Sequence, residues 1–164
     1  MTIALYPGTF DPVTNGHIDL MLRARRIFKS VLVAVAENPS KKPYFSLAQR
    51  IDMIENSLKE RSIDDVRAVS FNSLMVDCAK EYKAAVIIRG LRAVSDFEYE
   101  LQMALINRKL YSKVETIFMT PDQDLIFLSS STVKELARFG GCIKNFVPQY
   151  VYEKIREYSG GKRK

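Results

Sequence analysis

Small polar residues and a histidine stand between an apolar run and a helical pattern near the N-terminus of this chain. The apolar run at residues 3–6 predicts a short strand that ends at the Pro7-Gly8 pair, and the apolar spacing over residues 18–28 predicts a helix. Backbone amides at the start of a helix attract anions, because they lack partners within the helix and lie at its positive end. The junction therefore predicts a phosphate-binding site of the kind that holds a nucleotide. Its polar residues are Thr9, Thr14, Asn15, Gly16 and His17.

Two arginines follow another apolar run further along the chain. Arg89 and Arg92 come directly after residues 86–88, and Gly90 between them allows the backbone to approach a ligand closely. Guanidinium groups suit phosphate because their fixed donors engage two oxygens at once. This position favours phosphate binding over a place in the core.

Two further polar groups fit either a binding role or an ordinary structural one. Lys41 and Lys42 lie on a loop after the predicted second strand, where composition alone favours a solvated pair. Ser129, Ser130 and Ser131 precede a helical pattern, where their hydroxyls could cap the helix or hold phosphates. The residue types alone leave both alternatives open.

Composition predicts one ordinary globular domain. The chain has 164 residues, 47% hydrophobic and 27% charged, and no stretch reaches the roughly 18 consecutive apolar residues of a membrane-spanning helix. We expect a single domain over residues 1–159, a flexible basic tail at 160–164, no secretory signal and a cytoplasmic location. The tail supplies part of the formal charge of +6, so the charge argues only weakly for nucleic-acid binding.

Cys78 and Cys142 form no C-x-x-C pair, and a single histidine excludes an ordinary His/Cys zinc site.

Apolar runs alternate with helical patterns along the whole chain. Because each right-handed crossover places a helix against the sheet, this order predicts a doubly wound α/β fold with a mainly parallel five-stranded sheet and helices on both faces. Such sheets bind ligands beyond the carboxyl ends of their strands, where the strand order reverses, and the polar groups described above follow strands. The predicted strands are 3–6, 31–36, 66–71, 85–88 and 114–119. The predicted helices are 18–28, 46–58, 74–82, 94–110, a short one from about 131 to 139, and 148–158, with capping boxes at Ser46-x-x-Gln49 and Thr132-x-x-Glu135.

Taken together, the polar strings resemble a known enzyme family. Thr14-x-Gly16-His17, after the loop at residues 8–12, is similar to the signature of the nucleotidyltransferase superfamily. Further strings at 40–43, 88–92, 96–100 and 129–131 stand in family order, so the chain resembles the phosphopantetheine adenylyltransferases from about residue 3 to about residue 158. The resemblance implies a Rossmann-like nucleotidyltransferase fold. It also implies adenylyl transfer from ATP to 4′-phosphopantetheine, which gives dephospho-coenzyme A and pyrophosphate.

The resemblance assigns roles to individual residues. His17 would donate from its ring to the α-phosphate, and the flanking Thr14 and Gly16 favour this role over a helix cap alone. Leu125 stands where relatives often carry an aromatic residue, so it would contribute apolar packing or its backbone. The implied catalytic residues are His17, Lys41 and Thr9. The implied ATP-binding residues are Thr9, Phe10, His17, Gly90, Leu91, Arg92, Glu100, Leu125, Ile126, Phe127, Leu128, Ser129, Ser130 and Ser131. The implied residues for 4′-phosphopantetheine are Thr9, Lys41, Met75 and Arg89.

The resemblance also implies ligands and partners. Mg2+ is the expected cofactor, with no metal held by the protein itself. Coenzyme A is expected to compete with the substrate because the two share a pantetheine arm. The family forms homohexamers, and we expect neither nucleic acid nor a membrane as a partner.

Three other functions fit part of the pattern. Another adenylyl- or cytidylyltransferase, such as one acting on nicotinate mononucleotide, would share Thr14-x-Gly16-His17, but the strings at 89–92 and 96–100 favour pantetheine. A nucleic-acid-binding module would fit the basic balance, but the arginines follow strands instead of lining one helix face. A dinucleotide oxidoreductase would require a G-x-G-x-x-G string after the first strand, and this chain has none there.

Overall fold

The computed structural model describes residues 2–37, 42–92 and 94–160. Its strands are β1 (Ile3–Gly8), β2 (Ser30–Ala36), β3 (Val66–Phe71), β4 (Val86–Gly90) and β5 (Glu115–Met119). Its helices are α1 (Asn15–Ala24), α2 (Leu47–Lys59), α3 (Met75–Glu81), α4 (Val94–Leu110), α5 (Ser130–Arg138) and α6 (Gln149–Gly160), with a 3-10 turn, η2, at Gln123–Leu125.

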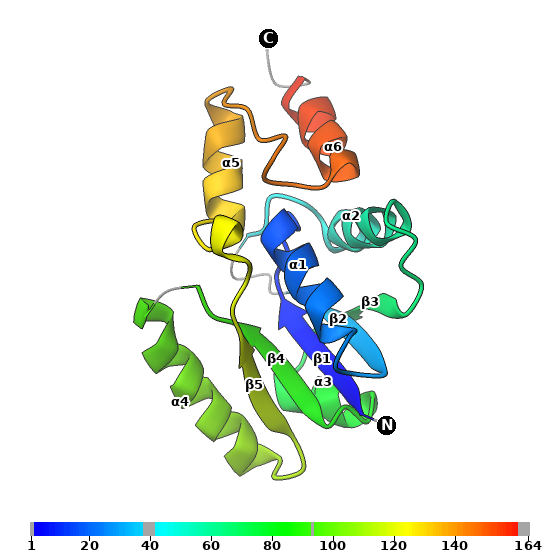
Figure 1. The fold of residues 1–164 in the computed structure, drawn as a ribbon, viewed down its shortest axis with the longest axis vertical. Coiled ribbons are helices and arrows are strands. Elements are labelled where there is room, and N and C mark those ends of the chain that lie inside the picture. The colour runs from blue at the N-terminus through cyan, green and yellow to red at the C-terminus, as the bar shows by residue number, and fades with distance from the viewer. Residues whose placement is uncertain (1, 38–41, 93, 161–164) are drawn as a thin grey trace.

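The five strands form one sheet in the order β3-β2-β1-β4-β5, and every strand pair is parallel (Figure 1). Leu5 in the central strand lies opposite Leu32 of β2 and Ile87 of β4. The chain winds outward from β1 in one direction through β3, then crosses back to place β4 on the other side. The predicted doubly wound parallel sheet is therefore confirmed, and its strand order reverses between β1 and β4.

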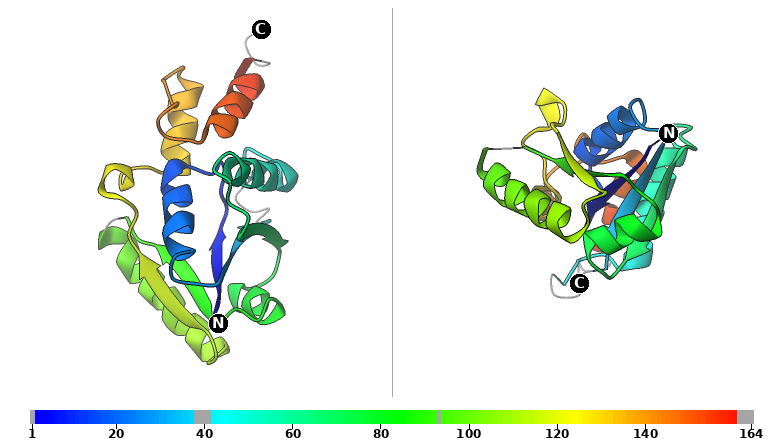
Figure 2. Two further views of the ribbon diagram at one scale, coloured as in Figure 1. Left: turned by 45° about the vertical axis from the view of Figure 1, so that its right-hand side comes forward. Right: turned by 90° about the horizontal axis from the view of Figure 1, so that it is seen from below.

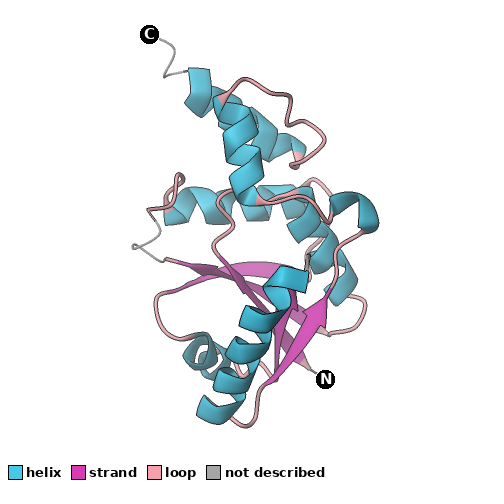
Figure 3. Ribbon diagram, turned by 90° about the vertical axis from the view of Figure 1, so that its left-hand side faces the viewer, coloured by secondary structure: helices cyan, strands magenta, loops and turns pink. Residues whose placement is uncertain are grey.

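Apolar side chains on the two faces of the sheet build two cores, and Figure 2 shows the helices on either side. Ala4 and Tyr6 of β1 pack in the larger core with α1 and α2, while Leu5 points to the smaller core with α3. Helix α4 lies along β5 and beside α3. Helices α5 and α6 lie beyond the carboxyl ends of the strands, where they extend the larger core (Figures 1 and 3). None of the described helices is both long and apolar enough to cross a membrane.

Several predicted boundaries shift in the structure. Strand β1 does not end before Pro7 and Gly8, because both residues continue the pairing with β2. Strand β4 likewise extends to Gly90, while α1 ends at Ala24, short of the predicted residue 28. Helix α6 runs to Gly160, and the rest of the predicted tail, 161–164, lies outside the described residues.

One predicted helix cap is confirmed and another is wrong. The hydroxyl of Ser46 accepts the backbone N–H of Gln49 at 3.3 Å, and the Gln49 side chain accepts the Ser46 N–H at 2.8 Å. Thr132 does not cap α5, because Ser129 takes that place and accepts the Thr132 backbone N–H at 3.0 Å. The run of three serines allowed more than one register, and the hydroxyl three residues earlier formed the cap.

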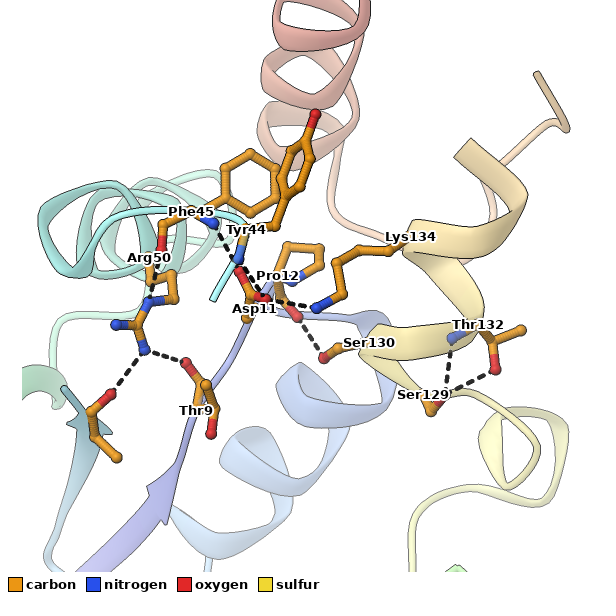
Figure 4. A network of polar contacts seen from close by, with 11 residues as sticks. Thr9, Asp11, Pro12, Tyr44, Phe45, Arg50, Ser129, Ser130, Thr132 and Lys134 are labelled. Atoms are coloured by element: carbon orange, nitrogen blue, oxygen red, sulfur yellow. Dashed lines mark hydrogen bonds and ion pairs between the residues drawn. The ribbon is translucent and has the colours of Figure 1, made fainter. Parts of the chain in front are cut away.

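A buried arginine of α2 joins the segments that surround the end of β1. Arg50 is only 1% exposed. Its guanidinium donates to the carbonyl oxygens of Thr9 and Ala36, both at 2.8 Å. It also donates to Phe45 at 3.2 Å and Glu37 at 3.4 Å. Figure 4 shows it between the loop after β1, the end of β2 and the turn before α2.

We predict that Arg50→Met lowers the free energy of unfolding by about 2–6 kcal/mol, since the Thr9 and Ala36 carbonyl groups lose their donor and each such group costs about 1–3 kcal/mol. Urea denaturation followed by circular dichroism measures the change. The matched control is Arg26→Met, at an exposed position. Equal stability of the two variants would contradict the role given to Arg50.

Candidate active site

A cleft of about 490 Å³ opens beyond the carboxyl ends of β1 and β4, at the point where the strand order reverses. It is the expected place for a ligand in this type of sheet. The predicted site residues that line it are Thr9, Phe10, His17, Arg89, Gly90, Arg92, Leu125, Leu128, Ser129, Ser130 and Ser131.

The first residues of α1 join a helix cap to the candidate catalytic histidine. The Thr14 backbone N–H donates to His17 Nδ1 at 3.0 Å, and the His17 backbone N–H donates to Thr14 Oγ1 at 3.4 Å. Because Nδ1 accepts a hydrogen bond from a backbone amide, it cannot carry a proton itself. The neutral ring therefore carries its proton on Nε2. The helix-cap and catalytic roles weighed for His17 are thus compatible, since different ring nitrogens serve them.

The ring of His17 is kept neutral by its surroundings. Burial, with a smaller contribution from the positive charge of Arg92, lowers the pKa of His17 to about 4. The ring lies edge-on to Phe10, with centroids 5.1 Å apart. At neutral pH the side chain is therefore a hydrogen-bond donor through Nε2 without carrying a charge.

Phe10 forms a rigid wall of the cleft beside His17. It is 3% exposed and has a positive φ of 50°, a conformation that costs energy for a bulky residue and is often found at functional sites. Gly8 makes room for it, because a Cβ on Gly8 would lie only 2.9 Å from the Phe10 ring. Phe10 also meets Tyr6 edge to face, with ring centroids 5.4 Å apart. The aromatic ring therefore fixes the loop between β1 and α1 against the sheet.

The N-terminus of α5 supplies a second anion-attracting end to the cleft. Ser129 caps this helix, and the Ser130 hydroxyl donates to the Pro12 carbonyl at 2.7 Å, which ties α5 to the loop after β1. Ser131 also lines the cleft. Because Gly16 and His17 of α1 line the same cleft, the positive ends of both helix dipoles meet there.

Asp11 and Lys134 line the cleft but were missed by the sequence-based site prediction. The Asp11 carboxylate accepts the backbone N–H groups of Tyr44 and Phe45, both at 2.9 Å, and the Lys134 ammonium at 2.5 Å (Figure 4). Lys134 follows the three serines closely and stands four residues after Ser130 on α5, so this local spacing could have placed it at the site. The partners of Asp11 are far away in sequence, so no local pattern pointed to it.

The two arginines differ in how they are held. Arg89 forms a two-pronged ion pair with Glu100 of α4, from Nε to Oε2 and from Nη2 to Oε1, both at 2.6 Å. Arg92 is more exposed, and its contacts are longer: 3.4 Å to the Leu128 carbonyl and 3.7 Å to the Asp96 carboxylate. Arg89 is thus fixed in orientation, whereas Arg92 is more loosely held.

Several predicted site residues do not line the cleft. Glu100 is buried against Arg89, and Leu91 continues the pairing with β5 by donating its N–H to the Met119 carbonyl at 3.0 Å. Met75 begins α3 and packs against the smaller core, away from this cleft. Ile126 and Phe127 precede Leu128 on the same loop but point outward, with 42% and 60% of their surfaces exposed. Lys41 lies outside the described residues.

We predict that the ring of His17 stays neutral, as the Nε2–H tautomer, down to about pH 4. Because the chain has one histidine, the ring gives a single set of signals in a ¹⁵N nuclear magnetic resonance titration. The pKa is lower in the folded than in the unfolded chain, so His17 contributes stability above about pH 6.5 that is lost as the pH falls toward 4. The urea-unfolded chain is the control. A native midpoint near 6.5 would contradict the buried, amide-bonded ring.

Comparisons with known proteins agree with this architecture. The model of the cytidylyltransferase-like family matches residues 5–136. Among solved structures, the bifunctional NMN adenylyltransferase/ADP ribose pyrophosphatase from Francisella tularensis superposes with a TM-score of 0.76 at 17% identity, over 98% of this chain and 50% of that one. Nicotinic acid mononucleotide adenylyltransferase from Plasmodium falciparum gives 0.74 at 16% identity, over 96% and 95% of the two chains. At such identities these structures show the nucleotidyltransferase-like fold alone.

Sequence relatives are much closer. A phosphopantetheine adenylyltransferase from Dictyoglomus thermophilum is 57% identical over 164 residues, which cover 100% of this chain and 99% of the relative. One from Heliobacterium modesticaldum is 50% identical over 160 residues, which cover 98% and 94% of the two chains. These matches confirm the resemblance drawn from the ordered polar strings. The chain therefore belongs to the cytidylyltransferase-like family and, within it, to the phosphopantetheine adenylyltransferases.

Proposed function

We propose that this cleft transfers the adenylyl group of ATP to 4′-phosphopantetheine, giving dephospho-coenzyme A and pyrophosphate. The observation that carries the proposal is the neutral His17, whose Nδ1 accepts an amide hydrogen bond at 3.0 Å and whose Nε2 is left to donate within a cleft lined by two helix N-termini. The full-length relatives carry the name of this activity.

The chemistry needs alignment and charge stabilisation more than proton transfer. An oxygen of the acceptor phosphate attacks the α-phosphorus of ATP, the bond from that phosphorus to pyrophosphate breaks, and pyrophosphate leaves with the electron pair. The α-phosphate oxygens gain negative charge as the new bond forms, and the Nε2–H of His17 stabilises them by a hydrogen bond that strengthens in the transition state. No side chain has to remove a proton, because the attacking phosphate is already ionised near neutral pH.

The cleft offers separate groups to the two substrates. For ATP we propose Phe10, Gly90, Arg92, Leu125 and Leu128 along the walls, with Ser129, Ser130 and Ser131 at the β- and γ-phosphates. Lys134 extends this set, because its ammonium lines the cleft next to the α5 N-terminus. Thr9 and Arg89 face the acceptor phosphate, and Lys41 keeps its proposed role at the transferred group. Met75, outside the cleft on α3, is proposed to meet the pantetheine arm.

Mg2+ fits this site as a companion of the ATP phosphates. Asp11 lines the cleft, but its two oxygens already accept two backbone N–H groups and the Lys134 ammonium. No group of three or more His, Cys, Asp and Glu residues capable of holding a metal occurs among the residues that the structure describes. Bound to the β- and γ-phosphates, Mg2+ would offset their negative charge. Proteins commonly bind Mg2+ together with the phosphates of a nucleotide.

We further propose a homohexamer that works in the cytoplasm as one domain over residues 1–159, with coenzyme A as a competing ligand. Helix α4 supports the assembly, because large apolar side chains remain exposed along it and would be buried against another copy. These residues are Phe97, Tyr99, Leu101, Leu105, Ile106 and Leu110.

We predict that the purified chain, mixed with Mg-ATP and 4′-phosphopantetheine, releases pyrophosphate and forms dephospho-coenzyme A. His17→Ala should lower kcat by roughly 100-fold with a smaller change in KM, since the lost hydrogen bond is strongest in the transition state. Mass spectrometry identifies the product, and a coupled assay follows pyrophosphate.

Nicotinate mononucleotide is the matched substrate control, because the rival enzymes of the superfamily act on it. Pyrophosphate release with this acceptor and none with 4′-phosphopantetheine would overturn the substrate assignment. A His17→Ala variant with normal kcat and only a raised KM would leave the reaction in place and remove His17 from the chemistry.

A further inference from the structure

Arg89 reaches the cleft with most of its hydrogen-bonding capacity already used. A guanidinium has five N–H groups. The Nε–H and one Nη2–H of Arg89 donate to the two oxygens of Glu100, both at 2.6 Å, and one Nη1–H donates to the Pro7 carbonyl at 3.1 Å. Against the described residues this leaves two N–H groups, one on each Nη nitrogen, that are available to donate to phosphate oxygens.

Glu100 stands behind Arg89 and not at the cleft surface. Arg89 lines the cleft, whereas Glu100 is 8% exposed and does not line it. Each Glu100 oxygen accepts from a different Arg89 nitrogen, so the pair holds the plane of the guanidinium as well as its position. Burial works to lower the pKa of Arg89, but the hydrogen bonds to Glu100 and its charge outweigh burial and raise the pKa. The arginine therefore keeps its full charge in a half-buried place.

We propose that Glu100 is a positioning residue that aims the two remaining N–H groups of Arg89 at the acceptor phosphate. This inference rests on the proposed function for the identity of the acceptor. The resemblance implies that Glu100 contacts ATP directly. In this proposal Glu100 instead acts on 4′-phosphopantetheine, and it does so through Arg89. Without the carboxylate, the guanidinium would be free to rotate about its side-chain bonds and would lose the fork that fits phosphate.

A direct contact with ATP and the positioning of Arg89 predict the loss of affinity for different ligands when Glu100 is replaced. Glu100→Gln keeps the size of the side chain but removes the charge and one acceptor. We expect calorimetric titration to show about 10-fold weaker binding of 4′-phosphopantetheine, the loss of roughly one charge-assisted hydrogen bond, and less than about a 2-fold change for Mg-ATP. Glu98→Gln, at an exposed position on the same helix, is the matched control and should change neither ligand. A loss mainly on the ATP side would overturn the inference.

A second background separates positioning from a general structural effect. In Arg89→Lys the fork is absent, so adding Glu100→Gln should weaken 4′-phosphopantetheine by less than about 2-fold further. An equal loss in both backgrounds would overturn the inference. If circular dichroism shows that Glu100→Gln is unfolded, Glu100→Asp takes its place, because it keeps the charge on a shorter side chain. We again expect a larger loss of affinity for 4′-phosphopantetheine than for Mg-ATP.

The outcomes also separate this inference from the proposed function. If the unmodified protein forms no dephospho-coenzyme A, the proposed function fails whatever Glu100 does. If it forms the product and the glutamine variant weakens only Mg-ATP, the reaction stands and Glu100 returns to a direct role at ATP.

Discussion

The hydrogen bond from the Thr14 backbone N–H to His17 Nδ1 is the interaction on which the proposed chemistry of this site depends. It closes the first turn of α1 and at the same time determines which ring nitrogen carries the proton. Had His17 been charged, Nδ1 would carry a hydrogen that faces another N–H. Burial keeps the ring neutral, so the helix cap and the neutral donor support each other. A single residue thereby places a helix N-terminus and a hydrogen-bond donor at the same cleft.

The walls around this donor are held by buried and paired charged groups. Arg50 fixes three backbone segments through their carbonyl groups. Asp11 joins the turn before α2 to helix α5 through the Tyr44 backbone N–H and the Lys134 ammonium. Glu100 plays the same part for Arg89. Because each of these groups is buried and well paired, the groups in the cleft are held in place before any ligand binds. Such preorganisation is what two mutually repelling polyanions require.

The sequence predicted what depends on local pattern and missed what depends on long-range pairing. The alternation of apolar runs with helical spacing was enough to predict the parallel sheet and a cleft beyond the carboxyl ends of its strands. His17 and the serines stood in short ordered strings. Asp11, by contrast, meets Lys134 across 123 positions of the chain, which no periodicity reveals. Glu100 was predicted to contact ATP, but in the structure it lies outside the lining of the cleft and pairs with Arg89, which follows from how α4 packs on the sheet. The sequence offered both the serines and Thr132 as the cap of α5, and Ser129 is the residue that caps it.

The most direct test of this account is a crystal structure with a non-hydrolysable ATP analogue in the cleft. We expect His17 Nε2 within about 2.7–3.2 Å of an oxygen of the α-phosphate, while Nδ1 remains bonded to the Thr14 N–H. The β- and γ-phosphates should lie at the N-terminus of α5. A ring that has left Thr14, or an α-phosphate beyond hydrogen-bond reach of Nε2, would show that the helix cap does not aim His17 at the α-phosphate.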